Sequence, residues 1–229
     1  MIVPFFYWTG WLIVRLLFTV YAKVEVVGAG NVPRRGGLII VSNHLNNADP
    51  GVVGAFLRRR VVFMAKDEMF QWPVLGGYVR LIGAFPVRRF EGDLKALRRA
   101  VHVIRRGQAL VMFPEGTRSK TGSMGEGHPG TAIVALRSGA PIVPVAITGS
   151  EVVRLPSAFF RPFRRAPIRL VVGQPFFLPA VSRPRAEDME QSTDIIMSRI
   201  AGLLPPEYRG HYRDRVPNTE SPAQKAPAI

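Results

Sequence analysis

Apolar runs of four to seven residues recur along the middle of the chain and have the length of buried strands. They lie at 37–41, 61–65, 84–87, 109–113, 141–147 and 168–172, and residues 23–28 alternate enough between polar and apolar to form a further short strand. Between several of them, apolar positions recur every three or four residues, as on one face of a helix. Such segments lie at 51–57, 70–81, 93–106, 130–137 and 189–204. Strands that alternate with helices predict an α/β fold with a mixed, partly parallel sheet flanked by helices.

The boundaries of two predicted helices are marked by particular residues. Asp93 is a residue type that caps helices, and Gly107 stands where the helix over 93–106 should stop. The segment 70–81 contains Pro73, Gly76 and Gly77, so we expect a broken helix there.

Residues 1–22 form a third kind of segment, which is apolar throughout and has a single charge at Arg15. A helix of about 20 residues is long enough to cross the roughly 30 Å of hydrocarbon in a bilayer. Arg15, well inside the apolar stretch, makes such a crossing costly. The segment is rich in aromatic residues that favour the headgroup boundary: Tyr7, Trp8, Trp11 and Tyr21. We therefore predict a helix lying in one leaflet; a spanning anchor and a helix packed only on the domain are the alternatives.

This pattern divides the chain of 229 residues into three parts. A membrane-associating helix over 1–22 precedes a single domain over 23–204, whose apolar content suffices for one hydrophobic core. Residues 205–229 are polar and rich in proline, so we expect a flexible tail.

The amino-acid composition limits which reactions and partners are possible for this chain. The chain has no cysteine, which excludes thiolate catalysis, disulfides and cysteine-ligated metals. Its net charge of +15 points to a polyanionic partner such as nucleic acid, anionic lipid, or a phosphorylated substrate or carrier; an arginine-rich genome is the alternative explanation. No zinc-finger, ribonucleoprotein or basic-zipper pattern is present, so we expect no nucleic-acid partner and no metal. Nothing in the sequence indicates an oligomeric state.

A histidine and an aspartate follow the predicted strand over 37–41. Asp49 stands five residues after His44, near enough to accept a hydrogen bond from one ring nitrogen across a single turn. A carboxylate in that place fixes the tautomer, which leaves the other nitrogen free to deprotonate a hydroxyl group. A structural histidine is the alternative explanation for this pair on spacing alone.

Cations follow other predicted strands. Lys66 ends one strand, and Arg88 and Arg89 follow another. The strand over 109–113 leads into a turn with Glu115 and Arg118, which has the composition of an anion-binding loop; a plain turn in which these two residues pair is the alternative. If these strand ends share one edge of the sheet, the cations form a phosphate pocket beside His44.

These blocks, taken in order over residues 24–150, resemble the glycerolipid acyltransferase family, in particular 1-acylglycerol-3-phosphate acyltransferases. Asn43-His44 with Asp49 is similar to the family's HX4D motif, which holds its catalytic pair. The blocks at 83–89, 113–119 and 143–145 resemble the next three motifs, and Lys66 matches a lysine found between the first two. The sequence departs from the family pattern at Asn46, where serine is common, and at Pro129, where a basic residue is frequent.

The resemblance implies a reaction. His44, steered by Asp49, would deprotonate the free hydroxyl of 1-acylglycerol 3-phosphate, whose oxygen would attack the thioester of acyl-CoA or acyl-carrier protein and give phosphatidic acid. It implies no cofactor and no covalent acyl-enzyme. The acceptor would be bound by Lys66, Arg88, Arg89 and Arg118, in a pocket shaped by Glu115, Gly116 and Thr117.

The same resemblance implies partners and a place in the cell. The partners are membrane lipid and the acyl donor, and the location is the cytoplasmic face of the cell membrane. The alternatives are an acyltransferase with another acceptor (glycerol 3-phosphate, a glycolipid or a lyso-amino lipid) and a noncatalytic membrane-surface protein that binds anions.

Overall fold

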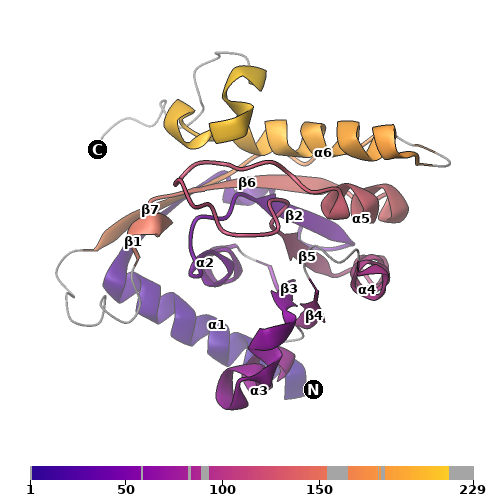
Figure 1. The fold of residues 1–229 in the computed structure, drawn as a ribbon. Coiled ribbons are helices and arrows are strands. Elements are labelled where there is room, and N and C mark those ends of the chain that lie inside the picture. Colours follow the sequence, from indigo (N-terminus) through magenta and orange to yellow (C-terminus); the bar gives the residue numbers. More distant parts are fainter. Residues whose placement is uncertain are drawn as a thin grey trace.

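A computed structural model describes residues 2–57, 59–81, 84–88, 93–153, 165–179, 181 and 184–216. One seven-stranded sheet, in the order β1-β7-β6-β2-β5-β3-β4, lies between two layers of helices (Figure 1). The strands are β1 Ala22–Val27, β2 Leu38–Ser42, β3 Val61–Lys66, β4 Phe85–Val87, β5 Ala109–Met112, β6 Ile142–Thr148 and β7 Ala166–Val172. All neighbouring strands are parallel except β6 and β7. The mixed α/β sheet expected from the sequence is confirmed.

The helices cover the sheet on both faces. They are α1 Ile2–Tyr21, α2 Asp49–Phe56, α3 Pro73–Leu81, α4 Leu94–Arg105, α5 Gly130–Ser138 and α6 Ala186–Ala201. In Figure 1, α4, α5 and α6 lie on one face and α1 and α2 on the other. The alternation of side chains along β2 produces these layers: Ile39 packs in the core beneath α4–α6, and Leu38 and Ile40 pack in the core beneath α2.

The predicted break is present at Pro73, whereas α3 continues through Gly76 and Gly77 without interruption. A short 3₁₀ helix, Asp67–Gln71, ends before Trp72, and α3 begins at Pro73. Proline is tolerated in the first turn of a helix, because an N–H group at that position would have no intrahelical acceptor.

Helix α1 packs on the domain through one face and exposes an apolar row on the other. Arg15 is exposed, but its side chain reaches back to the domain: Nη1 donates to the Ala55 carbonyl oxygen at 3.1 Å, close to the C-terminus of α2, and the guanidinium lies 5.0 Å from the centre of the Phe56 ring. Tyr7 is buried, and its hydroxyl accepts from the Val61 N–H at 3.1 Å. The charge that makes a bilayer crossing costly is thus satisfied by the protein itself.

The outer face of α1 is formed by exposed apolar side chains: Trp8, Leu12, Ile13, Leu16, Leu17 and Val20. Leu16 is 63% exposed, the highest value in this row. Among the described residues, no helix has both the length and the apolar character needed to cross a membrane.

The prediction of a flexible tail from residue 205 is wrong for its first twelve residues. Two 3₁₀ helices, Pro206–Tyr208 and Gly210–Arg215, continue the fold beyond α6. Tyr212 is 1% exposed and belongs to the core that also contains Ile196 and Ile200. A single buried aromatic residue in a polar, proline-rich stretch produces no periodic pattern of apolar positions. The ordered structure of this stretch could therefore not be predicted from the sequence pattern. Residues 217–229 lie outside the described residues.

Candidate active site

The carboxyl ends of four parallel strands bring the candidate residues to one edge of the sheet. Strand β2 leads into His44, β5 leads into the turn 113–119, β3 ends at Lys66, and β4 leads into Arg88. These four strands are neighbours in the order β2-β5-β3-β4. The four strand ends therefore lie at the same edge of the sheet, as the sequence predicted. Arg89 and Gly83 lie outside the described residues.

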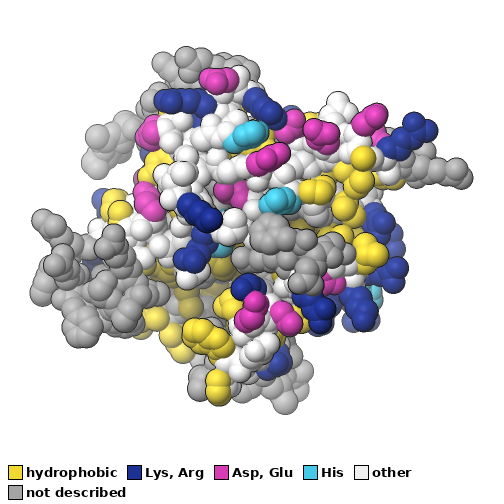
Figure 2. Space-filling model, in the orientation of Figure 1, with side chains coloured by type: hydrophobic (Ala, Val, Ile, Leu, Met, Phe, Trp, Pro, Cys, Tyr) yellow, Lys and Arg dark blue, Asp and Glu magenta, His cyan; other side chains and the backbone are white. Residues whose placement is uncertain are grey.

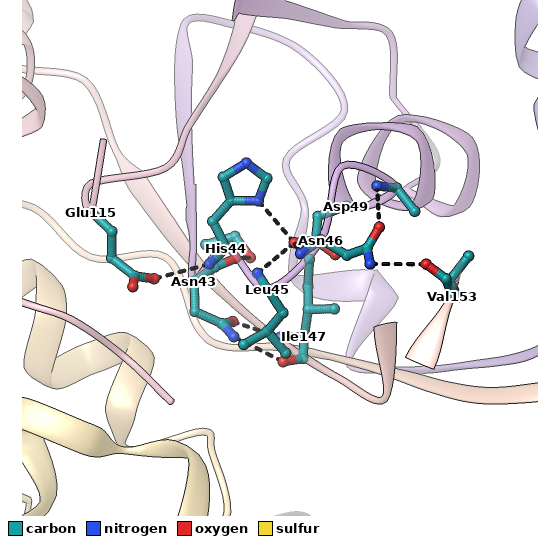
Figure 3. Close-up of polar contacts among 10 residues, drawn as sticks. Asn43, His44, Leu45, Asn46, Asp49, Glu115, Ile147 and Val153 are labelled. Carbon is teal, nitrogen blue, oxygen red and sulfur yellow. Dashed lines mark hydrogen bonds and ion pairs between the residues drawn. The ribbon is translucent and has the colours of Figure 1, made fainter. Parts of the chain in front are cut away.

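Asn43 fixes the point at which the chain leaves the sheet. Its side-chain Nδ2 donates to the Ile147 carbonyl at 2.9 Å, and its Oδ1 accepts from the Ile147 N–H at 2.8 Å (Figure 3). The side-chain amide thus continues the pairing between β2 and β6 after the backbone of β2 has turned away. His44, the next residue, starts from a fixed backbone position.

The imidazole of His44 is held by Asp49. Its Nδ1 lies 2.9 Å from Asp49 Oδ2, and the same oxygen accepts from the N–H groups of Leu45 and Asn46, each at 2.7 Å (Figure 3). Asp49 is fully buried at the first residue of α2, where the helix dipole favours negative charge. Because a carboxylate oxygen only accepts, Nδ1 carries the proton and Nε2 presents a lone pair.

Residues of the turn 113–119 pack against His44 from the other side. The ring of Phe113 stacks on the imidazole, with centroids 4.3 Å apart and planes inclined by 26°. The Ser119 N–H donates to the His44 carbonyl at 2.7 Å. His44 is 5% exposed, so the ring lies in a largely desolvated position.

Glu115 acts as a buried link between two loops. Its Oε1 accepts from the His44 N–H at 2.9 Å, and its Oε2 accepts from the Gly125 N–H at 2.8 Å. Both carboxylate oxygens are therefore used by the protein's own backbone. The described contacts of Glu115 thus join two stretches of backbone and are not those of a residue that holds the acceptor. Burial raises the pKa of Glu115 to about 7.

An apolar cavity of about 520 Å³ opens beside Phe113. It lies among β3, β4, β5, α4 and α5, and its apolar lining includes Met64, Val87, Leu97, Met112, Phe113 and Ile133. Gly116 and the side chains of Arg88, His128 and Thr131 also line it. Phe113 both lines the cavity and stacks on His44, so this one ring links the cavity to the histidine, which is not itself a lining residue.

The cations expected to bind a phosphate are exposed at this edge. Lys66 Nζ pairs with Glu68 Oε1 at 2.7 Å, and both side chains are about half exposed. Arg118 and Thr117 are exposed in the turn after Glu115, and Arg88 is exposed where it lines the cavity. In the part of the chain that the structure describes, no group of histidine and acidic side chains is arranged to hold a metal ion.

Comparisons with known proteins decide the family. Residues 23–148 match the model of the family described as Acyltransferase. The chain belongs to this family. It is therefore an enzyme of the O-acyltransferase class, and the resemblance identified in the sequence is confirmed.

Individual relatives agree with this assignment. A 1-acyl-sn-glycerol-3-phosphate acyltransferase of Bacillus subtilis is 26% identical over 194 residues, which cover 82% of this chain and 92% of that protein. A lyso-ornithine lipid O-acyltransferase of Pseudomonas aeruginosa is 31% identical over 141 residues, or 61% of this chain and 53% of that protein. This chain spans about half the length of two chloroplast relatives that it also matches.

The crystal structure of the 1-acyl-sn-glycerophosphate acyltransferase PlsC from Thermotoga maritima has the same fold. Its TM-score is 0.68 at 24% identity, and the superposition covers 86% of this chain and 77% of that chain.

Sequence reasoning missed the supports of the site. It singled out His44 and Asp49 but gave no role to the side chain of Asn43, whose partner Ile147 lies 104 residues away. It also missed the stack of Phe113 on His44. In the sequence, Asn43 and Phe113 are marked only by their position next to the candidate site residues.

The raised pKa of Glu115 predicts a dependence of stability on pH. Between pH 4.5 and 7 the folded state holds a proton on Glu115 that the unfolded state releases, so this group's contribution falls as the pH rises, by about 3 kcal/mol in all. In urea denaturation, the difference in unfolding free energy between wild type and Glu115→Gln should therefore fall across this window. The exposed Glu190→Gln provides the control and should give a constant difference; a constant difference for Glu115→Gln as well would contradict the prediction.

Proposed function

We propose that this protein transfers a fatty acyl group from acyl-CoA or acyl-carrier protein to the free hydroxyl of 1-acylglycerol 3-phosphate, giving phosphatidic acid. The observation that carries the proposal is the His44–Asp49 pair, which lies at the sheet edge beside an apolar cavity and exposed cations. A base, a place for a fatty chain and a place for a phosphate are what this transfer requires.

The chemistry assigned to His44 is general base catalysis. Nε2 takes the proton of the acceptor hydroxyl as its oxygen bonds to the thioester carbonyl carbon. The carbon–sulfur bond then breaks, and the departing thiolate takes the proton from the imidazolium. Asp49 stabilises that imidazolium through the 2.9 Å contact at Nδ1. This acyl transfer requires no external reductant, oxidant or cofactor.

The apolar cavity is assigned to a fatty chain. Its volume of about 520 Å³ lies within the usual range for small-molecule sites. Leu97, Met112 and Ile133 offer aliphatic surface, and burial of each methylene contributes about 0.8 kcal/mol. A chain bound there would bring its polar end to Phe113 and His44.

The acceptor phosphate is assigned to Arg118, Arg88 and Lys66, together with Arg89 beyond the described residues. The guanidinium fork suits two phosphate oxygens. The pairing of Lys66 with Glu68 does not prevent this role, because an exposed ion pair of this kind is worth only about 0–1 kcal/mol. A phosphate with two charges can therefore take the place of Glu68.

The exposed face of α4 suits an anionic donor. Lys95, Arg98, Arg99 and Arg105 are exposed on it, and α4 contains no acidic residue. Figure 2 shows the Lys and Arg side chains gathered over α4. Both CoA and acyl-carrier protein are anionic, so this face attracts either donor toward the adjoining cavity.

Membrane association is assigned to the outer face of α1. Its exposed apolar row, with Trp72 nearby in the chain segment before α3, fits a helix lying in the interface of one leaflet. Arg15 is itself exposed, but its hydrogen bond to the Ala55 carbonyl draws the guanidinium toward α2, which lessens the charge that insertion of this face would bring into hydrocarbon. The membrane lipid is also the source of the acceptor, and we expect the cytoplasmic face of the cell membrane.

Substitution of the catalytic pair tests the mechanism. In His44→Ala the general base is missing, so kcat should fall by about 10²–10⁴-fold while binding to lipid vesicles persists. Asp49→Asn should lower kcat as well, because the amide no longer selects the productive tautomer. The matched control is His102→Ala, an exposed histidine on α4, which should keep wild-type turnover. Turnover that survives in His44→Ala contradicts the base assignment.

A panel of acceptors tests the substrate. Lysophosphatidate should accept the acyl group faster than glycerol 3-phosphate or lyso-ornithine lipid, with both acyl-CoA and acyl-carrier protein offered as donors. Lyso-ornithine lipid is included because of the Pseudomonas relative. Arg118→Ala should raise KM for lysophosphatidate by about tenfold or more, the effect of one lost charge-assisted contact. Faster transfer to another acceptor would overturn the choice of lysophosphatidate.

Two leucines test the membrane assignment. The exposed Leu12 and Leu16 can be replaced together by glutamate without disturbing the core, and the variant should no longer sediment with anionic vesicles. Phe177→Glu, which alters an equally exposed apolar residue outside α1, should bind as wild type does. Undiminished binding of the Leu12→Glu/Leu16→Glu variant would contradict the assignment.

A further inference from the structure

The segment from residue 205 to residue 216, here called the C-terminal segment, lies outside the part of the chain that matches the family model. We propose that this segment positions the His44–Asp49 pair by bracing two loops that flank it, residues 124–128 and residues 149–153. Tyr208 and Tyr212 are its two positioning residues. The inference rests on the proposed role of His44 as the base.

The first loop is hydrogen-bonded to the C-terminal segment along its length. The Met124 N–H donates to the Tyr208 carbonyl at 2.9 Å, and the His211 N–H donates to the Met124 carbonyl at 3.0 Å. The Gly127 N–H donates to the hydroxyl oxygen of Tyr212 at 3.1 Å. This loop therefore takes its position from the C-terminal segment on one side.

On its other side, the same loop contacts the site. The Gly125 N–H donates to Glu115, whose second oxygen accepts from the His44 N–H. The His128 N–H donates to the Pro114 carbonyl at 2.8 Å, and His128 lines the apolar cavity. A shift of the loop is thus transmitted to the backbone of His44 through one carboxylate.

The second loop reaches the pair from the Asp49 side. The Tyr208 hydroxyl donates to Glu151 Oε1 at 2.6 Å. Two residues after Glu151, the Val153 carbonyl accepts from Asn46 Nδ2 at 3.0 Å (Figure 3). The Asn46 N–H in turn donates to Asp49 Oδ2. Tyr208 therefore acts on the aspartate by way of Asn46.

Two glycines show how closely the C-terminal segment and the first loop approach their neighbours. A Cβ at Gly210, whose φ is +45°, would lie 2.1 Å from the Met124 carbonyl oxygen. A Cβ at Gly127 would lie 2.6 Å from the side chain of Met197. With Tyr212 1% exposed, these contacts lie in a packed interior, where small displacements are not absorbed.

The test removes each hydroxyl and keeps each ring. Tyr208→Phe and Tyr212→Phe should each lower kcat by about tenfold with KM within about twofold, because a small misplacement of catalytic groups costs rate and leaves substrate binding nearly intact. The matched control is Asp194→Asn, which removes the charge that pairs at 2.8 Å with Arg215 of the same segment and alters neither loop. Its kcat should equal that of wild type. Assays run well below each variant's midpoint of thermal unfolding, so that all the protein is folded.

A second readout needs no substrate. The proton on Nδ1 of His44, hydrogen-bonded to a carboxylate, gives a downfield NMR signal that is assigned by its loss in His44→Ala. This signal should move or broaden in both tyrosine variants and keep its place in Asp194→Asn. An unmoved signal and an unchanged kcat in the folded tyrosine variants overturn the inference. Failure of the wild-type protein to acylate any acceptor would instead refute the proposed function, and the NMR signal still decides the positioning role.

Discussion

The structure of the site depends on one carboxylate oxygen. Asp49 Oδ2 accepts hydrogen bonds from His44 Nδ1–H and from the N–H groups of Leu45 and Asn46. A single atom therefore holds the loop after β2 against the first residue of α2. An oxygen that lost these donors would be a buried, unpaired charge, which proteins tolerate poorly. The geometry of the imidazole is therefore enforced by the same contacts that make the loop fold.

Around this atom, buried polar groups hold loops that hydrophobic packing alone would leave unspecified. The Asn43 amide extends the pairing of β2 with β6, and the Glu115 carboxylate joins His44 to Gly125. Hydrogen bonds in such an interior are costly to break, because water does not replace the lost partner. Rigid positioning of the histidine follows from this desolvation, since each loop has one arrangement that satisfies its donors.

The sequence predicted the layers of this fold well, because strand-length apolar runs and helical periodicity are local signals. All seven expected strands are present, and His44 and Asp49 were found because their partnership spans only five residues. The contacts that the sequence did not reveal are the distant ones. The partner of Asn43 lies 104 residues away, and Tyr212 reaches Gly127 across 85 residues. Local sequence patterns do not predict contacts between residues so far apart in the chain.

Arg15 shows a further consequence of the packing of α1. Its bond to the Ala55 carbonyl fixes the rotation of α1 about its own axis relative to α2, the helix that begins at Asp49. The outward row of apolar side chains on α1 and the carboxylate of Asp49 on α2 are therefore carried by two helices that pack against each other. For any surface that bound this row, the packing of α1 on α2 would set how far His44 and Asp49 lie from it.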